Sequence, residues 1–236
     1  VVVMSYDYSV LAGTQGTRNH LKTDRLIQLA ESKRVPIVLF AEGGGGRPGD
    51  TDRAPTSGLQ VPTFASLARL RGAVPLIAVV SGRTFAGNAA LAGVCDLIIA
   101  TPDANIGMGG PAMIEGGGLG RHRPEDIGPV DVHSANGVID IVAEDEAEAV
   151  ALARESLRIL QGRTNDVSRN AAERSVGVDG VSAAAERART IVPADRLRTF
   201  ATRDVIDAVG DADTFIEVRR NYAPGAVTGF IRVGGH

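Results

Sequence analysis

The stretch Val79-Val-Ser-Gly-Arg-Thr-Phe-Ala-Gly-Asn-Ala-Ala-Leu-Ala92 decides the fold. An apolar β-branched run ends at Val80, Gly82 supplies a turn, and an Ala- and Leu-rich segment follows. This order is typical of a strand, a tight turn and the start of a helix. The first N–H groups of a helix lack intrahelical acceptors and lie at the positive end of its dipole. Because Ala86 and Gly87 are small, the stretch predicts a site for an anion or a developing oxyanion, the alternative being an ordinary strand-to-helix turn.

The composition indicates one large or two small globular domains. The chain has 236 residues, is 44% hydrophobic and carries a formal net charge of −3. Its positive residues are scattered, so no nucleic-acid partner is expected. No apolar run approaches the ~20 residues that span a membrane, and no signal peptide is visible. We therefore expect a cytoplasmic location, with neither membrane binding nor export.

Ionisable side chains offer few recognisable catalytic patterns. The single cysteine, Cys95, lies in an apolar run, excludes an intramolecular disulfide and is predicted to be a buried thiol. The four histidines are widely separated, so no metal is expected in this chain. Glu42 and Asp50 flank a glycine-rich loop and are candidates for acid–base work, with solvent-facing carboxylates as the alternative.

Apolar runs and helical patterns alternate over residues 1–160, which predicts an α/β fold with largely parallel pairing. We expect residues 161–192 to be a helical or mobile connector, and residues 193–236 to begin a second unit. Both ends of the chain resemble interrupted elements, so we expect a piece of a longer polypeptide. The expected strands cover 1–10, 37–40, 75–80, 97–100, 138–142, 215–219 and 227–233, with an edge strand and loop at 103–111. The expected helices cover 19–32, 63–70, 144–160 and 204–209, in addition to the helix that the anchor stretch opens.

Glycines gather in loops that follow apolar runs, at 43–46, 109–110 and 116–118. Four consecutive glycines cost conformational entropy, and close approach of backbone N–H groups to a ligand would account for them. A surface loop is the alternative. Together with the scarcity of catalytic side chains, this pattern suggests chemistry performed by backbone donors. A thioester suits such donors, because its α-carbon becomes nucleophilic when the carbonyl oxygen can carry enolate charge.

Five long segments resemble one known family. They are Y-D-Y-S-V-L-A-G-T-Q-G (6–16), V-L-F-A-E-G-G-G-G-R-P-G-D-T-D (38–52), S-G-R-T-F-A-G-N-A-A-L (81–91), D-A-N-I-G-M-G-G-P-A-M-I-E-G-G-G-L-G (103–120) and E-D-I-G-P-V-D-V-H-S-A-N-G-V-I-D (125–140). In this order they resemble the carboxyltransferase (beta) component or domain of biotin-dependent acyl-CoA carboxylases.

The resemblance implies a crotonase-like fold of ββα repeats over residues 1–160 and the start of a second, similar half at 193–236. It implies transfer of a carboxyl group from carboxybiotin to the α-carbon of an acyl-CoA, with biotin attached to a carrier rather than to this chain. Biotin carboxyl carrier, biotin carboxylase and further copies of the chain, in a dimer-based hexamer, are the implied partners. Acyl chain length and a fused or separate arrangement of these components stay open.

The resemblance also assigns residues. It places the oxyanion donors on Ala86 and Gly87, where the family commonly has glycine at the first position. The implied acyl-CoA site consists of Gly44, Gly45, Arg47, Arg83, Phe85, Met108, Gly109 and Gly110. Of these, the two arginines would meet CoA phosphates, with ordinary surface arginines as the alternative.

Two other functions fit the same resemblance less closely. A free-standing crotonase-type hydratase or thioesterase would need a carboxylate that reaches the thioester, and Glu42 or Glu115 is the candidate. A carboxyltransferase-like assembly module would bind partners without catalysis.

Overall fold

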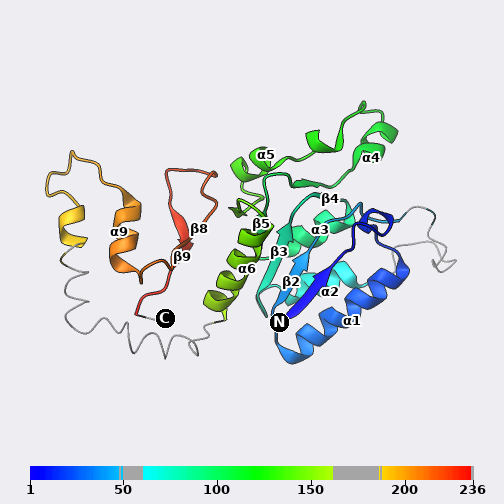
Figure 1. Ribbon diagram of the computed structural model, residues 1–236, viewed down its shortest axis with the longest axis horizontal. Coiled ribbons are helices and arrows are strands. Elements are labelled where there is room, and N and C mark those ends of the chain that lie inside the picture. The colour runs from blue at the N-terminus through cyan, green and yellow to red at the C-terminus, as the bar shows by residue number, and fades with distance from the viewer. Residues whose placement is uncertain (48, 50–60, 162–185, 187, 235–236) are drawn as a thin grey trace. The chain divides into compact units, whose positions relative to one another are not determined.

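A computed structural model describes all residues except 48, 50–60, 162–185, 187 and 235–236 (Figure 1). The described chain forms two compact units, Val1–Arg154 and Glu155–His236. Asp50 and most of the expected connector at 161–192 lie outside the described residues. Among the helices that are described, none has the length and apolar character needed to cross a bilayer.

The first unit is built on a five-stranded parallel sheet with strand order β1-β2-β3-β5-β7. All five residues of the central strand β3 are buried, so both faces of the sheet are covered, as parallel sheets require. The strands are β1 (Val2–Ser5), β2 (Ile37–Phe40), β3 (Leu76–Val80), β5 (Leu97–Ala100) and β7 (Ile141–Val142).

Helices α1 (Thr17–Lys33), α2 (Thr63–Leu70) and α3 (Gly87–Val94) share one apolar core with the sheet. Ile27, Leu67 and Leu91, one from each helix, are fully buried in that core. The long helix α6 (Glu146–Leu160) begins on the other side of the sheet (Figure 1). Its Ala149 and Ala153 are buried, so small residues let this helix approach closely.

Two short strands leave the main sheet and form a second one. β4 (Arg83–Phe85) follows β3, β6 (Asn105–Gly107) follows β5, and the two pair in parallel. In sequence order, β3 and β4 are followed by α3, and β5 and β6 are followed by α4 (Pro111–Gly116). A short 3₁₀ helix (Pro124–Asp126) and α5 (Val130–Ala135) follow before the chain returns to the main sheet at β7. This repetition confirms the predicted ββα organisation.

The second unit contains α9 (Thr202–Val209) and an antiparallel pair, β8 (Ile216–Val218) and β9 (Thr228–Phe230). A helix and two strands were expected at these places, and their types are confirmed. That this unit begins a second half similar to the first stays a prediction.

Two strands are shorter than expected, because local turns take up the backbone at one end of each. The first strand covers only Val2–Ser5, since a 3₁₀ turn at Leu11–Gly13 takes the chain out of the sheet. The strand expected over 138–142 is reduced to Ile141–Val142. There the N–H groups of Val138 and Ile139 donate to the carbonyl of His133 instead of to a neighbouring strand.

Gly128→Ala should destabilise the first unit by roughly 2–5 kcal/mol. Gly128 has φ +56°, and a Cβ there would overlap the carbonyl oxygen of Ile106. That carbonyl is held by His133 Nε2 at 2.7 Å, and Ile106 N–H donates to the Gly128 carbonyl at 2.9 Å, so neither backbone can yield. The estimate adds a left-handed conformation to an overpacked contact.

Urea unfolding followed by circular dichroism measures the change. Gly118→Ala is the matched control, because Gly118 has φ +75° but no described heavy atom within 4 Å of the new Cβ. It should lose only about 1–2 kcal/mol. Equal losses in the two variants would show that the collision with Ile106 contributes nothing.

Candidate functional site

The glycine loop at 43–46 runs along β4 towards the start of α3. Gly43 N–H donates to the Arg83 carbonyl at 2.9 Å, and Phe85 N–H donates back to the Gly43 carbonyl at 2.8 Å. Gly45 then lies against the α3 N-terminus: a Cβ on Gly45 would be 2.5 Å from Ala86 Cβ and 3.2 Å from the Gly87 amide nitrogen. The loop and the anchor turn, about 40 residues apart in the sequence, therefore form one structure.

Ala86 does not offer its N–H group to a ligand. This N–H donates to the Gly107 carbonyl at 2.8 Å, because the pairing of β4 with β6 continues one residue beyond β4. The prediction that Ala86 is an oxyanion donor is therefore wrong. Ala86 has φ +50° and ψ −118°, a conformation that strains a residue with a Cβ and turns the chain into α3.

The first N–H of α3 remains available. Gly87 is half-exposed, and no acceptor for its N–H is found among the described residues. No described side chain caps the helix either. In the glycine loop the N–H groups of residues 43–45 all have acceptors, whereas none is found within the described chain for the exposed Gly46.

A buried glutamine, Gln15, supports Gly87 from the side. Its backbone is joined to the glycine loop, since its N–H donates to the Gly45 carbonyl at 2.6 Å and its carbonyl accepts from Arg47 N–H at 2.8 Å. Its side-chain Nε2 lies 3.2 Å from the Tyr6 hydroxyl, and its Oε1 occupies the space that a Cβ on Gly87 would need. Sequence reasoning missed this residue, although its position between Gly13 and Gly16 was a signal.

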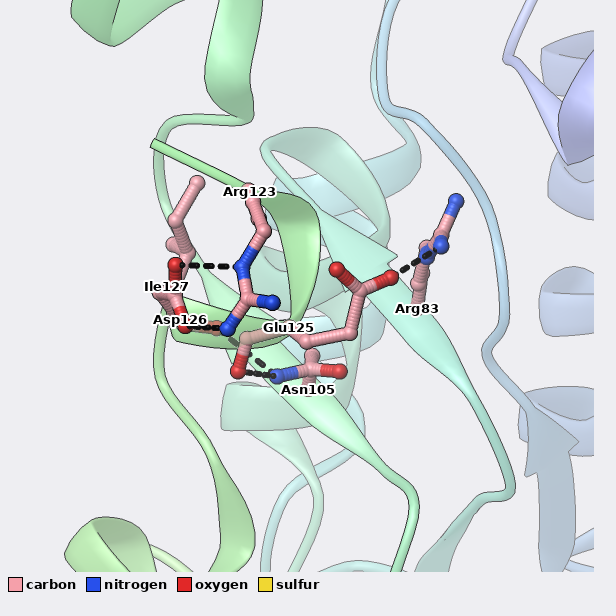
Figure 2. Close-up of polar contacts among 6 residues, drawn as sticks. All are labelled: Arg83, Asn105, Arg123, Glu125, Asp126 and Ile127. Atoms are coloured by element: carbon pink, nitrogen blue, oxygen red, sulfur yellow. Dashed lines mark hydrogen bonds and ion pairs between the residues drawn. The ribbon is translucent and has the colours of Figure 1, made fainter. Parts of the chain in front are cut away.

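The predicted phosphate-binding arginines both have protein partners. Arg47 donates to the Thr14 carbonyl at 3.0 Å and approaches Asn19 Oδ1 at 3.3 Å, which fixes the glycine loop to the start of α1. Arg83 forms an exposed ion pair with Glu125 (Figure 2). A phosphate would have to share or replace these contacts, so both assignments stay predictions.

Figure 2 shows how the turn at 125–127 is attached to β6. Asn105 Nδ2 donates to the carbonyls of Glu125 at 3.1 Å and Ile127 at 3.2 Å, and Arg123 forms a two-point ion pair with Asp126. Asn105 is buried, so these two bonds satisfy its amide donors away from water. The contacts make this turn a structural support.

The 107–110 segment presents both a buried and an exposed apolar group. Phe85 is only 6% exposed. Its ring packs so closely on Gly107 and Gly110 that a Cβ added to either glycine would lie within 3.5 Å of it. It therefore supports this segment from inside, and direct contact with a substrate stays a prediction. Met108 is 66% exposed and, with Met113 and Leu119, leaves apolar side chains in solvent around α4.

The two carboxylates that a hydratase could use, Glu42 and Glu115, both have protein partners. The Glu42 carboxylate accepts the Ser81 N–H, and Ser81 Oγ donates to Glu146 at 2.8 Å. Burial raises the pKa of Glu42 above its ordinary value, and the nearby charges of Glu146 and Asp103 add to this. Glu115 forms an exposed ion pair with Arg121 at 2.6 Å.

Cys95 is confirmed as a buried thiol. Burial raises its pKa to about 12, so the thiolate that a nucleophile requires is scarce at neutral pH. His20 is buried as well, with Nδ1 2.9 Å from Thr63 Oγ1.

These elements define an α/β protein of the crotonase-like fold, in which a glycine loop meets the N-terminus of a helix that follows a strand pair. The chain belongs to the carboxyl transferase domain family, whose model matches residues 1–236. The fold class and the family resemblance are thereby confirmed.

Similar proteins have related names. The biotin-dependent acetyl-/propionyl-coenzyme A carboxylase beta6 subunit of Mycobacterium bovis is 26% identical, over 97% of this chain and 46% of that subunit. A solved single-chain, multi-domain long-chain acyl-CoA carboxylase is 56% identical with a TM-score of 0.83, over 98% of this chain and 22% of that one. The hexameric transcarboxylase 12S, solved with hydrolysed methylmalonyl-CoA, is 26% identical with a TM-score of 0.73, over 98% of this chain and 44% of that one. The chain thus spans less than half the length of these proteins.

Proposed function

We propose that this chain forms the acyl-CoA side of a carboxyltransferase in a biotin-dependent acyl-CoA carboxylase. The observation that carries the proposal is the Gly87 N–H at the start of α3, which has no acceptor within the described chain and lies beside the glycine loop. Family membership and the named relatives support the reaction class. The helix dipole adds positive potential at this N–H, which suits a thioester oxygen that becomes negative.

The chemistry at this chain is the stabilisation of an enolate. When the acyl α-carbon loses its proton, negative charge moves to the thioester oxygen. That oxygen accepts a hydrogen bond from the Gly87 N–H. Gly46 N–H is our candidate for a second donor, in place of Ala86. Carboxybiotin, when bound, supplies the carboxyl group, and no residue of this chain is assigned to it.

Carboxybiotin, when bound, would give its carboxyl group to the acyl α-carbon, and the ureido nitrogen freed in this way would take up the α-proton. No protein base is required, which agrees with the engagement of Glu42 by Ser81 and of Glu115 by Arg121. The product is a malonyl-CoA-type thioester.

Among acyl-CoA substrates of different chain length, we expect long-chain acyl-CoA to be carboxylated fastest. Identity is 56% with the long-chain acyl-CoA carboxylase and 26% with the acetyl-/propionyl enzyme subunit and with transcarboxylase 12S. The exposed apolar groups of Met108, Met113 and Leu119 could contact such a chain. Gly44 and Gly45 are proposed to line the path of the thioester and pantetheine, and Gly109 and Gly110 to lie beside the acyl pocket.

The remaining parts of the proposal concern partners and place. Biotin carboxyl carrier and biotin carboxylase, on the same or another polypeptide, are the proposed partners, and the hexameric transcarboxylase 12S supports a homo-oligomer. We also propose a cytoplasmic location.

The decisive assay measures carboxyl transfer by the longest natural polypeptide that contains this chain, with its biotin carrier and a panel of acetyl-, propionyl- and long-chain acyl-CoA. We expect the double variant Glu42→Gln, Glu115→Gln to keep its transfer rate within about threefold, because the amide oxygen introduced by Glu42→Gln can still accept the Ser81 N–H. If the unchanged polypeptide hydrates an enoyl-CoA and the double variant does not, the result would support the hydratase instead. A monodisperse oligomer without affinity for CoA would support the assembly module.

A further inference from the structure

Asn88, the second residue of α3, is completely buried and uses both ends of its side-chain amide. Its Nδ2 donates to the Ala41 carbonyl at 3.0 Å and approaches the Glu42 carbonyl at 3.4 Å. Its Oδ1 accepts the Gly45 N–H at 3.0 Å. One side chain thus satisfies three backbone groups of the segment 41–45, which comes from a distant part of the sequence.

The loop is shaped to receive this amide. A Cβ on Gly43 would lie 2.8 Å from Asn88 Cγ, so only glycine lets the loop pass so closely. A primary amide is required, because the contacts need a donor at one end and an acceptor at the other. A buried amide that lost one of these partners would pay the desolvation cost of an unpaired group.

Asn88 is bonded directly to Gly87, whose N–H is the proposed oxyanion donor, and it holds Gly45, which lies against that same N–H. The distance between the loop and the donor is therefore set from both sides by one residue. We propose that Asn88 is a positioning residue for carboxyl transfer, which fixes the oxyanion donor relative to the glycine loop without touching the substrate. This inference rests on the proposed function.

The test is Asn88→Asp in the longest natural polypeptide that contains this chain. The carboxylate keeps the size of the side chain and an acceptor for Gly45 N–H, but it loses the donor towards Ala41 and Glu42. We expect kcat for carboxyl transfer to fall by about 10- to 100-fold, since a displacement near 1 Å costs up to that much. The KM for acyl-CoA should change by less than about threefold, because the carboxylate still accepts the Gly45 N–H and so keeps the loop against α3.

Asn105→Asp is the matched control. Asn105 is also buried and donates Nδ2 to two carbonyls, but these belong to the structural turn at 125–127 (Figure 2). Both variants should show lower melting temperatures. Rates are expressed per folded site, counted by titration with a non-reactive CoA thioether, and only Asn88→Asp should then lose kcat.

Equal losses of kcat per site in the two variants would overturn the inference, and so would an Asn88→Asp variant whose only change is a raised KM. If Asn88→Asp does not fold, Asn88→Ser, which is too short to reach Gly45, is judged by the same criteria. The proposed function fails separately, namely if the unchanged polypeptide transfers no carboxyl group, and the inference then fails with it. Active wild-type enzyme with an unaltered Asn88→Asp kcat would overturn the inference alone.

Discussion

Gly87→Pro should reduce carboxyl transfer by about 100- to 1000-fold, the typical cost of removing one oxyanion donor. Proline deletes the N–H and is tolerated at the first position of a helix, which Gly87 occupies. A side chain at this position also collides with Gln15 Oε1, however, so the single substitution would change two things at once.

The collision is removed by working in a Gln15→Ala background. Tyr6, which loses its contact with Gln15 in that background, still has Thr23 as a hydrogen-bond partner. Gly87→Ala is then the matched control, because it adds a Cβ and keeps the N–H. The ratio of kcat between the alanine and proline variants isolates the contribution of this one donor. If the two variants transfer carboxyl groups equally fast, Gly87 N–H is not the donor.

Gly45→Ala should reduce carboxyl transfer by about 100-fold or more. The new Cβ would be 2.5 Å from Ala86 Cβ and 3.2 Å from the Gly87 nitrogen. A methyl group this close to the nitrogen competes for space with an oxygen, which must come within 2.7–3.1 Å of an oxyanion donor. Gly45 also has φ +82°, so part of any loss could come from backbone strain alone.

Gly72→Ala separates these causes, because Gly72 has φ +79° and no described heavy atom within 4 Å of the added Cβ. It should lose about 1–2 kcal/mol of unfolding free energy and retain its kcat. Transfer rates and urea unfolding of both variants, in the longest natural polypeptide, make the comparison. Full activity in folded Gly45→Ala would remove the glycine loop from the proposed site.

Much of the fold could be predicted from local patterns. Apolar β-branched runs such as Pro75–Val80 become buried strands because a parallel sheet hides both of its faces. Helix α2, expected at Thr63–Leu70, has those bounds in the structure, because its apolar spacing and Pro62 at its start are local signals. The small helices α4 and α5 were not predicted, since each has only six residues and too little periodicity to be recognised.

The candidate site was predicted in part for the same reason. The strand, glycine turn and helix of the anchor stretch are local, and they placed Ala86 and Gly87 near the start of a helix, although strand β4 between the turn and the helix was not predicted. Which N–H groups stay unpaired is not a local property. The Ala86 N–H donates to the carbonyl of Gly107, 21 residues further along the chain, because the pairing of β4 with β6 continues one residue beyond β4.

By itself the sequence determined the α/β class, the glycine loops and the family, since periodicity, turn residues and long matching segments are all written in the order of the residues. Only the tertiary structure decided that Gly87 rather than Ala86 keeps an N–H without an acceptor in the described part of the chain, and that Asn88 and Gln15 hold the two sides of the site. The physical reason is that a hydrogen bond satisfies whichever groups the packed fold brings within about 3 Å, and that distance is set by folding, not by separation along the chain.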